Sequence, residues 1–134
     1  MSQDNLGLAR KVVAAFNRRD VAALAEMVTD DFEWVTWTGT VEHTAYHGAA
    51  GLASYFRDSD VWDVLNLEVH EYRDLGDELL VVGVFHARGG GSGVEIHAPY
   101  YSAFFVRGDR LARVMSFRSE EEALAAMDRG RSPG

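Results

Sequence analysis

Histidine and tyrosine are the side chains of this chain that could move or donate a proton near neutral pH. Histidine has the only ordinary side-chain pKa between pH 5 and 8, and a tyrosine hydroxyl can donate a hydrogen bond to a substrate oxygen. The chain contains no cysteine, which excludes thiolate nucleophiles, disulfides and Cys-ligated zinc. No catalytic carboxylate is evident from spacing. The candidate catalytic residues are therefore His86, His97 and Tyr101.

The remaining histidines suggest less chemistry. His47 stands at an expected turn, where a local hydrogen bond is the simpler role, and His43 and His70 are expected in solvent. For His86 and His97, a structural role on a strand remains open as the alternative to a catalytic role. Histidines scattered over a loop and two strands lack the tight spacing of a metal site, so we expect neither a metal nor another cofactor.

Hydrophobic periodicity predicts the elements of the first half of the chain. Apolar residues at helical spacing predict a helix over residues 6–19 and a second helix over Val21–Val28, capped by Asp20. Phe32–Trp37 is rich in aromatic and β-branched residues and predicts the first strand. A third short helix is expected around Leu52–Phe56.

The second half of the chain predicts a meander of strands and a closing helix. Alternating or β-branched runs predict strands over 65–70, 79–87, 94–106 and 111–118. Turn signals between them favour antiparallel hairpins. Ser119 and Glu122 form a capping-box pattern that opens a C-terminal helix. We therefore expect one α+β domain over residues 1–134, with 129–134 a frayed tail.

Composition and charge exclude several partners. The chain has 134 residues, 47% hydrophobic and 25% charged, which is ordinary globular usage with room for one sizeable core. Its formal charge of −8 disfavours nucleic acid and anionic membranes. The sequence shows no run of about 20 apolar residues and no basic start followed by an apolar run. We expect a cytoplasmic protein that contacts neither nucleic acid nor membrane.

Several segments resemble recurring segments of the NTF2-like superfamily, which includes SnoaL-like and ketosteroid isomerase-like proteins. They are Val13–Asp20, Val28–Trp34, Tyr46–Gly48, Arg107–Arg113 and Glu122–Leu124. The segment from Gly93 to Leu124 is similar to the SnoaL-like cyclase branch in particular. The resemblance implies an α+β cone, in which a curved antiparallel sheet of strands of mixed length wraps around three N-terminal helices, with a short C-terminal helix.

The resemblance argues against the ketosteroid isomerase reaction itself. The position of that family's carboxylate base falls on Thr36, which cannot abstract a proton near neutral pH. The two donor positions fall near Val12 and Ser102, so two of three chemical roles are lost. The limonene-type epoxide hydrolases have no clear match either. Loose possibilities for their charged set are Asp58, Asp60, Asp63 and Arg118.

The resemblance also implies a pocket inside the cone. The ligand-binding residues it implies are Trp34, Thr36, Tyr55, Phe56, Trp62, Phe85, Tyr100, Ser102, Met115 and Phe117. Plain core packing is the alternative for each of them. Gly83 is expected to leave room for a ligand, and Met115 and Phe117 are expected to share one face with Leu111. Strand register decides whether Tyr100 and Ser102 or His97 and Tyr101 face inward. His86 is expected to face away from Phe85 and the pocket, unless a bulge near the glycine-rich connection turns it inward.

Two hypotheses for function follow. The first is a pocket protein for a small apolar, cyclic or aromatic metabolite, acting as a cofactor-free isomerase, cyclase, dehydratase or hydrolase. The alternative is a non-catalytic ligand-binding or dimerisation module. A homodimer is expected under both, with Trp37 and its apolar neighbours on the outer face of the sheet as the contact.

Overall fold

The computed structural model describes residues 2–36, 45–58, 62–76, 78–89, 91 and 93–131, and leaves the side chains of residues 2–4, 62 and 128–131 undescribed. The elements are α1 (Ser2–Arg18), α2 (Val21–Met27), β1 (Val28–Val35), β2 (Tyr46–His47), α4 (Gly48–Asp58), β3 (Trp62–Asp74), β4 (Glu78–Gly89), β5 (Glu95–Arg107), β6 (Arg110–Phe117) and α5 (Glu120–Arg131). Helix α5 therefore includes the first part of the expected frayed tail, and residues 132–134 lie outside the described part of the chain.

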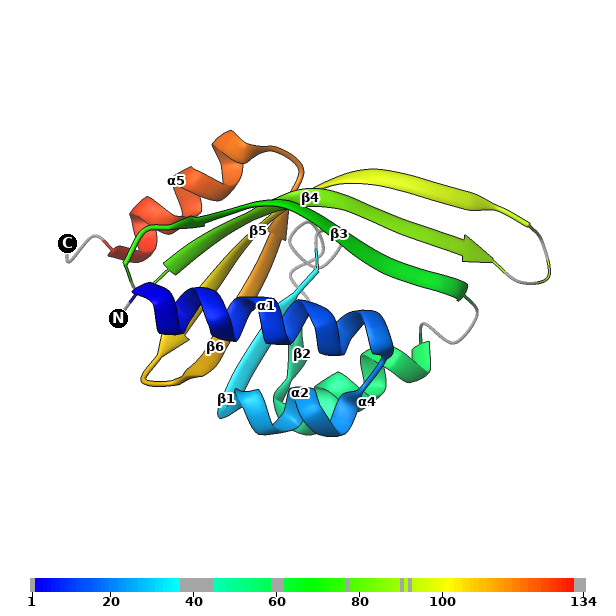
Figure 1. Ribbon diagram of the computed structural model, residues 1–134, viewed down its shortest axis with the longest axis horizontal. Coiled ribbons are helices and arrows are strands. Elements are labelled where there is room, and N and C mark those ends of the chain that lie inside the picture. The colour runs from blue at the N-terminus through cyan, green and yellow to red at the C-terminus, as the bar shows by residue number, and fades with distance from the viewer. Residues whose placement is uncertain are drawn as a thin grey trace.

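The strands form one six-stranded sheet in the order β2-β1-β6-β5-β4-β3. Helices α1, α2 and α4 lie against one face of this sheet and α5 lies against the other (Figure 1). The α+β fold expected from the sequence is confirmed. The sheet is mixed rather than antiparallel throughout, because β1 pairs with β6 in the parallel direction.

Apolar side chains form a core on each face of the sheet. Alternation along β4 sends Leu79 and Val81 to the helices α1, α2 and α4, and sends Leu80 and Val82 to the opposite face. The second face packs against α5 through Ala123 and Met127, both fully buried. We call the face toward α1 the inner face and the face toward α5 the outer face.

An asparagine joins α1 to the edge strand β3. Asn17 Nδ2 donates to the carbonyl oxygen of Leu67 at 3.1 Å, and the Leu67 amide donates to Asn17 Oδ1 at 2.8 Å. An edge strand presents backbone groups that no neighbouring strand satisfies, so this side chain takes the place of a seventh strand at one residue. It holds the inner-face residue Leu67 against the helices.

Two helix caps expected from the sequence are confirmed. Asp20 Oδ1 accepts the Ala23 amide at 3.1 Å at the start of α2, and Ser119 Oγ accepts the Glu122 amide at 3.1 Å at the start of α5. The Glu122 carboxylate accepts a longer bond of 3.4 Å from the Arg118 amide. Both helices therefore start where local polar side chains satisfy their free amides.

Gly83 has a different role from the one expected. A Cβ at this position would stand 1.9 Å from the Glu68 carbonyl oxygen on β3, so a side chain would collide with backbone. The close approach coincides with a register shift in the β3–β4 pairing between Val69 and Glu71. The glycine admits the neighbouring strand rather than a ligand.

The expected face for Met115 is also wrong. The β5–β6 pairing shifts between Phe105 and Val106, so Ala112 is an extra residue on β6. This bulge reverses the alternation after Leu111. Met115 and Phe117 consequently share the outer face, where Phe117 also reaches the cavity, while Leu111 and Val114 belong to the inner core.

Candidate functional site

A cavity of about 350 Å³ lies between the inner face of the sheet and the three N-terminal helices. Its volume falls in the range of small-molecule pockets. Helical residues on its wall are Val12, Val13, Phe16, Leu24, Leu52 and Tyr55. Strand residues on its apolar wall are Val28, Phe32, Trp34, Leu67, Phe85, Phe104, Leu111, Val114 and Phe117. This mostly apolar wall suits an apolar molecule.

Aromatic rings form one side of the cavity. The rings of Trp34 and Tyr55 have centroids 4.1 Å apart with a tilt of 33°, and Phe16 meets Trp34 edge-on at 5.9 Å. Tyr46 meets Tyr55 edge-on at 5.5 Å. These rings come from α1, β1, β2 and α4, so the aromatic wall exists only when the helices dock on the sheet. Flat ring faces of this kind favour a flat apolar ligand.

The polar part of the wall is small and contains Tyr100. Its phenol hydrogen-bonds with Ser102 and Ser116, and Ser116 also lines the cavity. Ser116 Oγ donates to Ser102 Oγ at 3.5 Å, and Ser102 Oγ donates to the Met115 carbonyl oxygen at 2.9 Å. A hydroxyl can reorient, so this row of hydroxyl groups can donate a hydrogen bond to a ligand carbonyl or accept one from a ligand hydroxyl.

Burial raises the pKa of the Tyr100 hydroxyl above its ordinary value of 10.0, an effect larger than the opposing hydrogen bonds from the two serines. Tyr100 is therefore neutral at physiological pH and keeps its proton. A neutral phenol in an apolar cavity is a hydrogen-bond donor rather than a base.

A second tyrosine lies on the cavity wall near its α4 side. Tyr46 Oη donates to Asp58 Oδ2 at 3.2 Å. Burial, followed by the adjacent Asp58 carboxylate, raises the pKa of Tyr46. This hydroxyl is therefore also protonated near neutral pH, and the Asp58 carboxylate contacts the cavity wall through it.

The inner face includes most of the expected ligand-binding residues. The cavity wall contains Trp34, Thr36, Tyr55, Phe85, Tyr100 and Phe117. Phe56 is buried behind this wall and packs against Phe16 at 5.6 Å. Ser102 is fully buried and reaches the cavity only through Tyr100 and Ser116, and Met115 lies on the outer face. Trp62 begins β3, and its side chain is outside the described part of the structure.

The three residues predicted to be catalytic lie on the outer face. The β4–β5 register is unbroken from Glu78 to Arg88, so alternation places His86 and His97 opposite each other and away from Phe85 and the cavity. The bulge that would have turned His86 inward does not occur in this pairing. Tyr101 packs in the outer core under α5. None of the three lines the cavity.

The sequence reasoning missed two polar wall residues. Ser116 was overlooked because simple alternation from Leu111 places it on the outer face. The extra residue Ala112 shifts this alternation and turns Ser116 to the inner face. Tyr46 belongs to the short strand β2, which has too few residues to show a pattern. Among the described wall residues no histidine, carboxylate, lysine or arginine occurs, so hydroxyl groups supply the polar chemistry.

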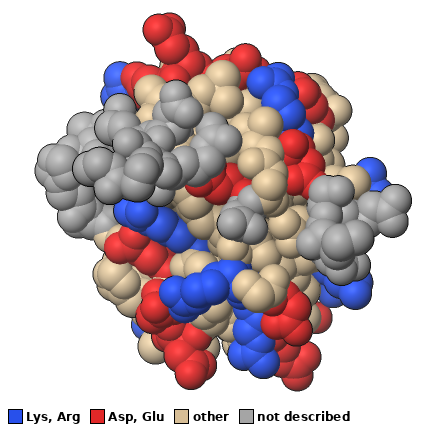
Figure 2. All heavy atoms as spheres, turned by 90° about the vertical axis from the view of Figure 1, so that its left-hand side faces the viewer, with Lys and Arg blue, Asp and Glu red and all other residues tan. Residues whose placement is uncertain are grey.

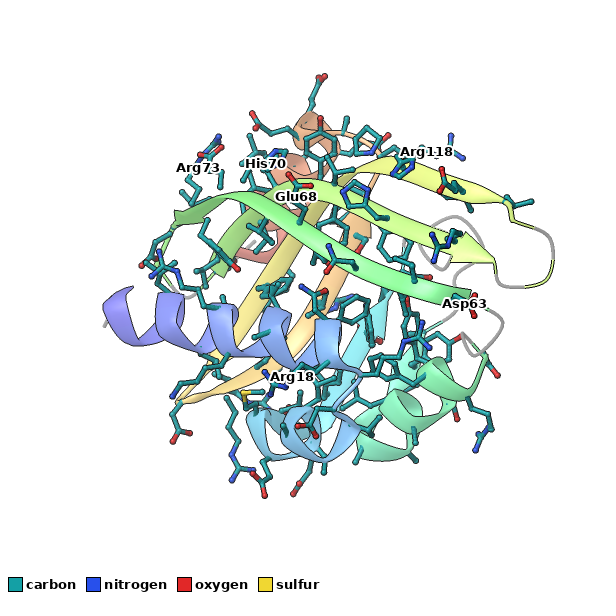
Figure 3. All side chains as sticks on the ribbon, turned by 45° about the vertical axis from the view of Figure 1, so that its right-hand side comes forward. Arg18, Asp63, Glu68, His70, Arg73 and Arg118 are labelled. Carbon is teal, nitrogen blue, oxygen red and sulfur yellow. The ribbon has the colours of Figure 1, made fainter. Side chains whose placement is uncertain are left out.

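The charged candidates for an epoxide hydrolase set do not gather at the cavity. Asp63 and Arg118 lie on β3 and after β6 respectively, well apart in Figure 3, and neither lines the cavity. Asp60 is outside the described residues. Acidic and basic side chains are intermixed on the face shown in Figure 2. In the described part of the chain, no helix is both long and apolar enough to cross a membrane.

A curved sheet with three helices over its inner face and a cavity between them defines a protein of the NTF2-like class. Solved structures agree with this class. The chain matches an NTF2-like protein of unknown function from Burkholderia pseudomallei with a TM-score of 0.76 and 17% identity, over 91% of this chain and 95% of the other. The sequence matches the SnoaL-like domain over residues 9–114, and the chain belongs to that family.

Two further solved structures with this fold are a complex with a small molecule and a candidate enzyme. TerC, co-crystallised with polyporic acid, matches with a TM-score of 0.75 and 18% identity, over 94% of this chain and 96% of the other. A candidate SnoaL-like polyketide cyclase from Shewanella denitrificans matches with a TM-score of 0.74 and 16% identity, over 94% and 97%. No curated protein sequence matches this chain significantly. Identities this low support the fold alone.

Proposed function

We propose that this SnoaL-like protein binds a small, flat, apolar metabolite with a cyclic or aromatic framework and one oxygen substituent. The observation that carries the proposal is the cavity of about 350 Å³, which is apolar except for a few hydroxyl groups. The aromatic wall of Trp34 and Tyr55 would contact the ring system. Tyr100 and Ser116 would meet the oxygen.

The proposed chemistry is stabilisation of oxygen charge by the neutral Tyr100 phenol. A donor fixed in an apolar site stabilises an enolate or alkoxide that develops on a bound carbonyl compound. Isomerisation or cyclisation through an enolate begins with the loss of a substrate proton. The described wall offers donors and no group that is an effective base near neutral pH, so water or another base from solution would take that proton. Substrates with an intrinsically labile proton would be the ones to react. With other ligands the protein would act as a binder.

The matched probes 2-naphthol and naphthalene test this assignment. They share one ring framework and differ in a hydroxyl group, so the ratio of their dissociation constants reports the polar end of the cavity. Loss of one hydrogen bond costs about 1.4 kcal/mol, so Tyr100→Phe is expected to reduce the preference for 2-naphthol about tenfold. Fluorescence titration of both probes gives the ratio.

Tyr101→Phe is the matched control, because it removes the same hydroxyl from the neighbouring residue on the outer face. We expect this variant to keep the wild-type ratio. Equal ratios in all three proteins would exclude Tyr100 as the polar contact. Failure of both probes to bind the wild-type protein would remove the proposal of an apolar ligand altogether.

A second copy of the chain is the proposed protein partner. The expected contact Trp37 lies outside the described residues. Among the residues that the structure describes, the exposed large hydrophobic side chains are Val94 and Ile96, at the free end of the β4–β5 hairpin. This hairpin extends beyond the helices in Figure 1. Burying it against a second copy would cover both side chains.

A further inference from the structure

The outer face carries a row of facing polar side chains that the cavity does not use. They are His97 on β5, His86 on β4, and Glu68 and His70 on β3. His86 and His97 are directly opposite each other in the β4–β5 register. Figure 3 shows Glu68 and His70 on the side of β3 turned away from α1. The sheet therefore separates this row from the proposed ligand.

The two histidine rings meet through the same kind of nitrogen. His86 Nδ1 lies 2.6 Å from His97 Nδ1, with ring centroids 4.9 Å apart and ring planes at 68°. On the far side of each ring stands a carboxylate. His86 Nε2 lies 3.0 Å from Glu68 Oε1, and His97 Nε2 lies 3.8 Å from Glu95 Oε2.

The carboxylates favour one tautomer of each ring. With its Nε2 proton donated to Glu68, neutral His86 presents the lone pair of Nδ1 to His97. The charge of Glu95 favours the corresponding proton on His97 Nε2, which leaves the lone pair of its Nδ1 facing back. At 2.6 Å one Nδ1 can donate a hydrogen bond to the other; when both rings carry their proton on Nε2, the two lone pairs face each other and a cation between them would satisfy both.

We propose that His86 Nδ1 and His97 Nδ1 bind a late first-row divalent cation on the outer face, with Zn²⁺ as the probe ion. Imidazole nitrogen is a preferred ligand of such ions. A carboxylate on the second nitrogen of a ligating histidine is the usual outer-shell partner, because it fixes the tautomer and raises the basicity of the ligand. Glu68 has this position for His86 at 3.0 Å, while Glu95 lies 3.8 Å from His97 Nε2 and acts on it through its charge rather than a hydrogen bond.

The side chains can adjust to the size of the ion. Tetrahedral zinc with Zn–N bonds near 2.0–2.1 Å separates two nitrogens by about 3.3 Å, so the rings must open by roughly 0.7 Å. Both rings can move, since 26% of the His86 side chain and 58% of the His97 side chain are exposed. Water has access to the remaining positions. Among the described residues no group of three or more histidine and carboxylate side chains is placed to hold an ion, so the histidine pair is what this part of the chain contributes.

The local charge favours a cation. Glu68 on β3 and Glu95 on β5 lie on either side of the pair, while Arg88 lies opposite Glu95 at the end of β4. The chain as a whole carries a formal charge of −8. A proton shared between the two imidazoles is the competing occupant.

Calorimetric titration of the full chain with Zn²⁺ at pH 7.5 tests the proposal. We expect one ion per chain, or one per two chains if copies share it, and a loss of affinity of at least about tenfold in His86→Ala and in His97→Ala. Glu68→Gln is expected to weaken binding by about tenfold through the loss of its outer-shell charge. Binding should also fall as the pH drops through the histidine range, because protons compete for the ligand nitrogens.

His47→Ala is the control, since it removes an exposed histidine from β2, at the opposite edge of the sheet from β3 and away from Glu68. It should keep wild-type affinity within about twofold. Equal affinity in wild type, His86→Ala and His97→Ala would overturn the site, as would nitrogen-15 spectra in which Zn²⁺ leaves both Nδ1 signals unchanged. Naphthol binding in the cavity should be the same in all these variants, so failure here is distinguishable from failure of the proposed function.

Discussion

Replacing Asn17 with alanine tests how the edge strand that forms part of the cavity wall is held. The substitution removes two hydrogen bonds to one residue and leaves the Leu67 amide and carbonyl without a protein partner on that side. A buried unsatisfied group costs about 1–3 kcal/mol, and these bonds are only part-buried, so about 1 kcal/mol each is reasonable. The expected loss is about 2 kcal/mol, or roughly thirtyfold in the unfolding equilibrium.

Urea denaturation followed by tryptophan fluorescence measures this loss, and a change of about 2 kcal/mol corresponds to a drop in Tm of about 7 °C for a domain of this size. Asn5→Ala is a graded control, because Asn5 makes a single bond of 2.9 Å to the Gly76 carbonyl oxygen. Its expected cost is about half as large. A loss below about 0.5 kcal/mol for Asn17→Ala would refute the claim that this side chain fastens β3 to α1.

Three further predictions concern a strand contact, a titration and assembly. Gly83→Ala should lower the free energy of unfolding by about 3 kcal/mol, because the added Cβ would collide with the backbone of β3. Urea denaturation measures this loss, and wild-type stability would disprove the close approach. The raised pKa of Tyr100 stabilises the fold below the ordinary value of 10.0, and this contribution disappears as pH rises through the folded pKa. Stability of Tyr100→Phe should therefore decline less at alkaline pH, and an unchanged decline would contradict the burial of the phenol. Light scattering should find a dimer that Val94→Ser with Ile96→Ser weakens at least tenfold; a wild-type monomer would rule out the second copy.

Local sequence signals predicted the elements of this fold because each signal acts over a few residues. Asp20 and Ser119 cap their helices as expected, since a cap depends on a side chain and an amide only three residues away. The alternation of β5 is a local signal of the same kind. It left two registers open, and Tyr100 lies on the cavity wall as one of them predicted. The resemblance to NTF2-like proteins supplied the order in space, which alternation cannot give.

The site was less predictable because it depends on contacts between distant segments. The extra residue Ala112 in β6 turns Met115 outward and Ser116 inward, and nothing in its own neighbourhood marks it. Whether His86 faced the cavity depended on a bulge that the β4–β5 pairing does not contain. Gly83 was assigned to a ligand because its real neighbour, the Glu68 carbonyl, lies on another strand.

The central claim is that the cavity binds a flat apolar molecule with its oxygen at Tyr100. A crystal structure with 6-bromo-2-naphthol tests this most directly, because the anomalous signal of bromine locates the ring without bias. We expect one peak inside the cavity beside the Trp34–Tyr55 wall, and the naphthol oxygen within hydrogen-bonding distance of the Tyr100 hydroxyl. Bromine peaks confined to the outer surface, with the cavity free of ligand at saturating concentration, would contradict the account.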